Sequence, residues 1–168
     1  MKKFTKKEIE EQRVSFRKDN YLELEANIAN RNLKYFMLPL EIMPEMIRKY
    51  LPDFIFRMTG EPKDGYVLGI SYKVKEEFRK YAILNEYIEF MEKDLNNSDR
   101  AVESEKEVLK YVPEKIKLDY IKWRADFFQR ILNGNKKNPE MFMFSPSDVC
   151  AFEKNELMLE KIILDYSL

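Results

Sequence analysis

The chain has 168 residues, of which 45% are hydrophobic and 14% are aromatic. This length predicts one domain, and the aromatic content excludes a disordered chain, because disordered chains are poor in aromatic residues. The 30 Lys and Arg residues equal the 30 Asp and Glu residues in number, which argues against a nucleic-acid partner, since binding to phosphates normally needs a basic excess.

The chain contains no histidine and a single cysteine, Cys150. The commonest general base of enzymes is therefore missing, and neither a Ser-His-Asp triad nor a Cys-His pair can form. Zinc sites normally need histidine or several cysteines, so we expect no metal and no cofactor. One cysteine forms no intrachain disulfide, and no segment has the pattern of a signal peptide or a membrane helix. We therefore expect a cytoplasmic protein with no membrane partner.

The N-terminal segment begins with a helix signal. Thr5 and Glu8 have the spacing of a capping box, and apolar residues then recur at helical spacing, so we expect a helix that ends near Asn30–Asn32. Lys34–Leu38 is short and apolar, which predicts a strand. Pro39 follows it, and because proline cannot donate to a ladder we expect this strand at a sheet edge.

A β-hairpin is predicted after a short helix. Pro44–Leu51 indicates the helix, because proline is tolerated at a helix start. Phe54–Met58 and Tyr66–Tyr72 have the composition of strands, and Gly60–Gly65 between them is the strongest turn signal of the chain. We therefore expect these two strands to pair as a hairpin.

Helices dominate the second half. Apolar residues at helical spacing predict helices over Lys75–Leu95, Asp99–Tyr111 and Glu114–Leu132. The third helix carries one stripe of large side chains, namely Tyr120, Trp123, Phe127 and Ile131. Its periodicity assigns the stripe to the core, and an exposed stripe would indicate a protein contact instead.

The C-terminal segment is predicted to end in a last helix. Asn133–Asn135 indicates the stop of the preceding helix, because glycine adopts a left-handed cap. Met141–Phe144 is a short apolar run that we assign to a fourth strand. Ser145 then opens the last helix, in which we assign Cys150 to the core, a reactive thiol at the helix start being the alternative.

These elements together predict an α+β fold. We expect a small antiparallel sheet of three or four strands, packed with five or six helices, and a helical C-terminal half. Residues 1–168 form a single domain in this interpretation. The break at Asn96–Ser98 is where it would divide into an N-terminal α/β half and a C-terminal helical half.

One predicted strand and the following helix carry a motif with chemical meaning. After Tyr66–Tyr72, the helix contains Asn85-Glu86-x-x-Glu89. This order resembles the core of the zincin metallopeptidases over about residues 54–110, where an edge strand precedes a helix that bears H-E-x-x-H. The resemblance implies that Glu86 takes the place of the general base, and that Asn85 and Glu89 take the places of the metal-binding histidines.

The same resemblance implies that Glu103 or Glu107, on the next helix, is placed like a third ligand. Both histidines are missing, so the resemblance implies a related scaffold and neither peptidase activity nor a bound metal. The alternative is an amphipathic helix whose carboxylates are solvated or paired with Arg79 or Lys93.

Two groups of carboxylates suggest a further alternative, an all-oxygen site for Mg²⁺ or Mn²⁺. The first group is Glu86, Glu89 and Glu92, and the second is Glu103, Glu105 and Glu107. Lysines are interspersed among them, which is typical of a solvated helix face, so we expect no metal here.

We therefore expect a non-enzymatic protein-interaction or regulatory protein, with a protein partner or a second copy of the chain. This hypothesis predicts an exposed apolar patch. The alternative is a catalytically degenerate, zincin-like protein, which predicts that Asn85, Glu89 and a downstream Glu converge on one cleft.

Overall fold

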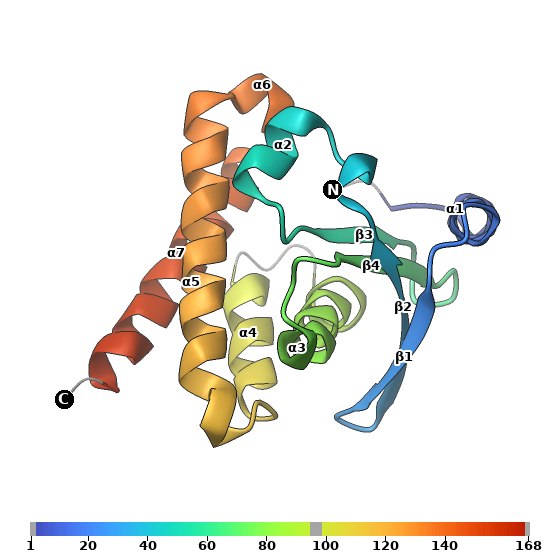
Figure 1. Cartoon of the computed structure of the whole chain (residues 1–168). Helices are drawn as coiled ribbons and strands as arrows, with labels where there is room; N and C mark the ends of the chain where they lie inside the picture. The colour runs from blue at the N-terminus through green and yellow to red at the C-terminus, as the bar shows by residue number, and fades with distance from the viewer. Residues whose placement is uncertain (1–2, 95–98, 167–168) are drawn as a thin grey trace.

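A four-stranded sheet and a group of long helices lie side by side in the computed structural model, which describes residues 3–94 and 99–166 (Figure 1). The elements in chain order are α1 (Lys6–Lys18), β1 (Glu23–Ile28), β2 (Arg31–Leu38), the 3₁₀ turn η1 (Leu40–Ile42), α2 (Glu45–Tyr50), β3 (Ile55–Thr59), β4 (Tyr66–Ser71), α3 (Glu76–Tyr87), the π-helical turn η2 (Ile88–Glu92), α4 (Arg100–Leu109), α5 (Glu114–Lys137), α6 (Pro139–Phe142) and α7 (Pro146–Asp165). The predicted α+β class and the helical C-terminal half are confirmed.

The sheet has the strand order β1-β2-β4-β3. The β1–β2 and β3–β4 pairs are antiparallel, and β2 pairs with β4 in parallel. The sheet is therefore mixed, and the expectation of an antiparallel sheet was wrong at this one pair. The predicted hairpin of β3 and β4 is confirmed. Strand β2 is interior, not an edge strand, because Pro39 lies beyond its last residue and removes no donor from the ladder.

The predicted first helix is shorter than expected. The capping box of Thr5 and Glu8 is present, but α1 ends at Lys18, and Asn20 has a positive φ of 57°. Strand β1 follows, and a two-residue turn with positive φ at Ala29 and Asn30 joins it to β2, as in a type I′ hairpin. The fourth strand is thus β1, and residues 141–144, expected to supply it, form part of α6 and the connection after it.

Side chains of alternate residues in the interior strands supply two buried clusters. On β2, Leu33, Tyr35 and Met37 join the cluster that α3 covers, whereas Phe36 and Leu38 join the cluster that contains buried residues of α1. Both clusters include side chains of α5. The N-terminal and C-terminal halves therefore share their cores. The predicted subdivision at Asn96–Ser98 lies outside the described residues.

A buried carboxylate joins α5 to the segment before β3. Asp53 accepts a hydrogen bond from Trp123 Nε1 at 2.6 Å and two from the Arg130 guanidinium at 2.7 and 2.8 Å. These three hydrogen bonds, two of them from a charged guanidinium, compensate the loss of water around the buried Asp53 carboxylate. This contact holds α5 beside β3.

Helix α5 continues through the predicted stop at Asn133–Asn135 and ends at Lys137. Gly134 is buried inside it, and a Cβ at this position would lie 2.5 Å from Phe142 Cζ. The glycine is therefore needed for close packing of α6 and not for a left-handed cap. The last predicted helix is confirmed as α7, with a capping box between Ser145 and Asp148. Within residues 3–94 and 99–166, no helix combines the length and the apolar character that crossing a membrane requires.

Substitution of Gly134 by alanine should destabilise the protein by about 1–3 kcal/mol, because the added methyl group overlaps the Phe142 ring. Urea unfolding followed by circular dichroism measures this change. The control is Asn133→Ala, at the exposed neighbouring position, where alanine favours the helix and stability should stay equal or rise. Equal stability of both variants would contradict the packing role of Gly134.

Candidate functional site

A cavity of about 260 Å³ lies between β3, the end of α3, and the helices α2, α4, α5, α6 and α7. Its walls are mostly apolar and are formed by Met43, Ile47, Leu51, Phe54, Ile55, Phe90, Ala101, Phe127, Phe128, Ile131, Phe142, Phe144 and Phe152. Four charged residues complete the wall, namely Arg57, Glu86, Glu89 and Arg124. An apolar cavity with a few polar groups at one end is the usual form of a small-molecule site.

Two parts of the cavity wall are half-buried. Met43, Ile47, Phe144 and Phe152 form one part, which we call the rim, and Ile55 and Arg57 on β3 form the other. Phe54 and the remaining lining residues are buried. Three of the four charged residues come from β3, the end of α3 and η2, away from the rim.

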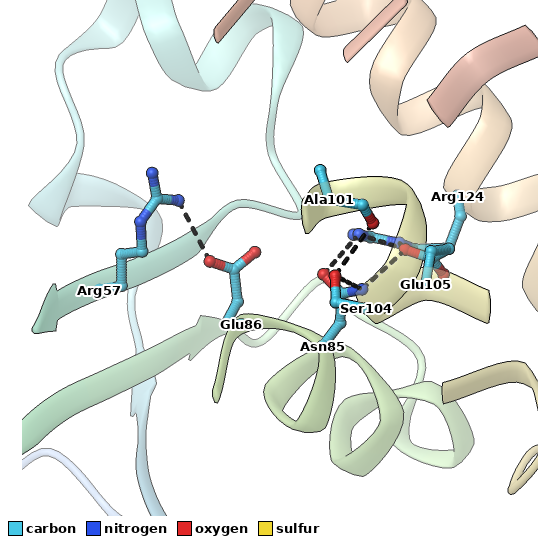
Figure 2. Close-up of polar contacts among 7 residues, drawn as sticks. All are labelled: Arg57, Asn85, Glu86, Ala101, Ser104, Glu105 and Arg124. Carbon is cyan, nitrogen blue, oxygen red and sulfur yellow. Dashed lines mark hydrogen bonds and ion pairs between the residues drawn. The ribbon is translucent and has the colours of Figure 1, made fainter. Parts of the chain in front are cut away.

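Helix α3 directs two neighbouring side chains to different partners. Asn85 and Glu86 are consecutive, so they lie about 100° apart around the helix axis. Figure 2 shows Glu86 pointing toward β3 and Asn85 pointing toward α4. The helix is buried on most of its circumference, so both polar side chains need partners inside the protein.

Glu86 forms an ion pair with Arg57 on the edge strand β3. Arg57 Nη1 lies 3.1 Å from Glu86 Oε2, as Figure 2 shows. The Arg57 guanidinium also lies over the Phe90 ring, 3.6 Å from its centre. The Glu86 side chain is buried, whereas the Arg57 side chain is 34% exposed, so the pair is only partly removed from water and is screened on the Arg57 side.

Asn85 belongs to a fully buried network that connects α3, α4 and α5. Arg124 donates from Nε and Nη2 to Glu105 Oε2, at 3.0 and 2.8 Å, and from Nη2 to Asn85 Oδ1 at 3.2 Å. Asn85 Nδ2 donates to Glu105 Oε2 at 3.0 Å and to Ser104 Oγ at 3.2 Å. Burial acts to lower the pKa of Arg124, but the charge of Glu105, its hydrogen bond to Arg124 and the charges of Tyr120 and Glu86 together outweigh burial, so the pKa of Arg124 is raised and it stays protonated.

One nitrogen of Arg124 keeps both of its N–H groups unsatisfied. Arg124 is 1% exposed, and its Nη1 has no hydrogen-bond partner among the described residues. No other side chain of the cavity wall has such a buried, unpartnered polar atom within the described chain. A buried donor without an acceptor is costly and often indicates a missing partner.

Glu89 lies in the π-helical turn η2, a distortion that is frequent at functional sites. Burial and the negative charge of Glu86 raise the pKa of Glu89 to about 7, although Arg57, Arg100 and Arg124 act against this shift. Arg100 Nε on α4 lies 3.7 Å from Glu89 Oε1. The pKa of Glu89 therefore lies near neutral pH, as is typical of a carboxyl group that is buried beside a second carboxylate.

The structure brings some of the predicted site residues together and separates others. Asn85, Glu86 and Glu89 lie at the polar end of the cavity or directly behind it. Glu103 is exposed, and its Oε2 lies 3.8 Å from Lys93 Nζ. Glu107 contacts Lys110 at 2.7 Å and Tyr111 at 3.2 Å on the surface. Neither of these two carboxylates reaches the cavity.

Glu105 was not singled out from its neighbours in the sequence, although a signal existed. Ala101, Ser104, Glu105 and Val108 recur at helical spacing and are all buried. Recognition of this stripe would have placed Glu105 on the inner face of α4.

The arginine partners were also unexpected. Arg79, an expected partner, donates from Nε to Val74 O instead, and Lys93 pairs with Glu103. The partners of Glu86 and Glu89 are arginines from β3 and α4.

The residues of this site do not fit a metal ion. The described residues contain no group of three His, Cys, Asp or Glu side chains that could hold one. Arginine guanidinium groups from three elements supply the positive charge that the carboxylates need. Cys150 is exposed rather than in the core, because the inner face of α7 at this turn is taken by Ala151 and Asn155.

Comparison with models of protein families, with curated proteins and with solved structures found no significant match to this chain.

Replacement of Arg124 by methionine should destabilise the protein by about 3–5 kcal/mol, because it leaves Glu105 buried without a counter-charge. The double variant Arg124→Met with Glu105→Gln should recover much of this loss. Chemical unfolding of the single and double variants gives the coupling free energy. Additive effects of the two substitutions would contradict a direct buried pair.

The pKa of Glu89 predicts a pH-dependent stability. Its value in the folded protein, about 7, exceeds its ordinary value of 4.5, so the folded state binds the proton more tightly than the unfolded state. Stability should fall by on the order of 2 kcal/mol as the pH rises from about 5 to about 8. Glu89→Gln should remove most of this decrease in urea unfolding curves. A variant that keeps the full pH dependence would show that another group titrates.

Proposed function

We propose that this chain is a non-enzymatic binding protein that holds a small amphipathic molecule in the cavity and acts as a regulatory or interaction protein. The supporting observation is the cavity itself, whose wall is apolar except at one end, where Arg57, Glu86, Glu89 and Arg124 meet. Protein sites for small molecules combine these two features, because apolar walls provide affinity and a few polar groups fix the orientation.

The composition of the wall argues for binding over catalysis. Among the described residues, the wall includes no Ser, Thr, Cys or Lys side chain that could act as a nucleophile. Glu86 pairs with Arg57, and Arg124 is held by Glu105 and Asn85. These contacts are suited to holding a polar head group in one place.

A second candidate is a catalytically inactive relative of the zincin metallopeptidases. One observation favours it: Glu86 and Glu89 line a cavity between the hairpin strand β3 and helix α3. Metal analysis of the purified protein separates the two candidates. Stoichiometric metal that is lost in Glu89→Ala would favour a zincin-like scaffold that holds a metal through carboxylate oxygens, and its absence would favour the metal-free binding protein.

Contacts with a protein partner or with a second copy of the chain are part of the proposal. Leu157 and Leu164 are each 66% exposed and lie two turns apart on α7, and Met143 is 83% exposed. Burial of these exposed apolar side chains against a partner would contribute favourable free energy. The balanced charge favours no nucleic-acid partner, and the single, exposed Cys150 is compatible with the cytoplasm that we propose as its location.

A rim substitution tests the proposed function. Ile47→Trp places an indole at the rim of the cavity, so the neutral probes octan-1-ol and indole should lose their binding. Isothermal titration calorimetry measures this, and circular dichroism verifies the fold. The matched control is Met46→Trp, the exposed neighbour on α2 that does not line the cavity. Absence of binding to the unsubstituted protein, or equal binding to both variants, would contradict the proposal.

A further inference from the structure

The polar end of the cavity requires an acceptor from its ligand. Arg124 lines the cavity, and its Nη1 donor has no partner among the described residues. Figure 2 shows Arg124 reaching from α5 across α4 to Asn85. Its Nε and Nη2 are engaged with Glu105 and Asn85, so the guanidinium cannot turn to find another partner. A ligand oxygen is the natural acceptor for the two N–H groups of Nη1.

The charges around this end select the kind of head group. Three guanidinium groups and three carboxyl groups lie at this end or directly behind it, namely Arg57, Arg100, Arg124, Glu86, Glu89 and Glu105. They balance when all are ionised. An ammonium ligand would add a fourth positive charge, and no group at this end can remove a positive charge, because arginine stays protonated. An uncompensated buried charge is costly, so an ammonium is disfavoured.

A carboxylate ligand has a compensating group. Glu89 faces Arg57 from β3, Glu86 from α3, Arg100 from α4 and Arg124 from α5, and its pKa of about 7 allows proton uptake near neutral pH. With Glu89 protonated, three positive charges face two protein carboxylates and the ligand carboxylate. The balance of charge is then restored, and Glu89 becomes a hydrogen-bond donor.

The apolar part of the cavity limits the size of the ligand. A protein cavity of about 150 Å³ holds a benzene molecule, and this cavity measures about 260 Å³. The walls are lined largely by phenylalanine and aliphatic side chains. They fit one aromatic ring with a short chain, or an alkyl chain of medium length.

We infer that the cavity binds an amphipathic monocarboxylic acid, with the apolar body among the phenylalanines and the carboxylate beside Arg124 and Arg57. This inference rests on the proposed function and names its ligand class. Because Glu89 is the carboxyl group that can be protonated near neutral pH, binding of the ligand carboxylate is coupled to the uptake of one proton by Glu89. The affinity for carboxylates therefore increases as the pH falls.

Three matched probes test the ligand class: octanoate, octan-1-ol and octylamine. The head groups of the acid and the amine keep their charges from about pH 6 to about pH 8. Isothermal titration calorimetry should give the tightest binding for octanoate and the weakest for octylamine. Octanoate should bind about tenfold more weakly at pH 8 than at pH 6, because proton uptake at Glu89 becomes unfavourable. Octan-1-ol should show no such change.

Two variants and one matched control locate the head group. Arg57→Met should weaken the binding of octanoate by about tenfold, since it removes one charged partner of the carboxylate. The affinity for octan-1-ol should stay nearly unchanged. Lys49→Met removes the same charge from α2 outside the cavity wall and should change neither. Glu89→Gln should abolish the pH dependence of octanoate binding, which keeps the inference testable even if Arg57→Met does not fold.

The outcomes separate this inference from the proposed function. Binding of octan-1-ol with equal or weaker binding of octanoate overturns the carboxylate inference and leaves the binding function standing. If octylamine binds most tightly of the three probes, the carboxylate inference is likewise overturned and the binding function stands. Failure of all three probes to bind overturns both. Octanoate binding that keeps its pH dependence in Glu89→Gln also overturns the inference, because another group then takes up the proton.

Discussion

The buried pair of Arg124 and Glu105 holds three helices in register. Its partner Asn85 comes from α3, Glu105 from α4 and Arg124 from α5. Two charges without access to water would be very unfavourable alone, and the pair is tolerated because each group meets the other and a third polar side chain. Any shift of one helix along another would break several of these bonds at once, so the network defines one relative position of the three helices.

That position creates the cavity. With α5 held against α4 by Arg124 and against the segment before β3 by Asp53, the aromatic side chains of α5 face β3 across a gap that is closed by α2, α6 and α7. Arg57 and Glu86 then close the polar end from the side of the sheet. The large apolar side chains fill most of the interior, and the remaining space is bounded by charge at one end and by half-buried side chains at the other.

Helix and strand assignments from the sequence succeeded where one signal was unambiguous. The capping boxes at Thr5 and Ser145 and the turn before β4 mark local structure through short-range hydrogen bonds, which a sequence shows directly. The assignment failed for β1, because Leu24 and Ile28 are four residues apart, a spacing that suits one face of a helix and also alternate positions of a strand. The predicted helix stop at Gly134 was also wrong, because this glycine is required by the close packing of Phe142 and not by a left-handed cap.

The sequence by itself determined the α+β class, the helical second half, and the presence of Asn85, Glu86 and Glu89 on one helix without any histidine. Only the tertiary structure decided that these three residues face arginines, and that Glu105 joins them while Glu103 and Glu107 remain on the surface. The physical reason is the range of the interactions: Arg57 and Glu86 are 29 residues apart, and Glu105 and Arg124 are 19 residues apart. Periodicity shows which face of a helix is buried, but the partner that neutralises a buried charge is chosen by the packing of elements distant in the chain.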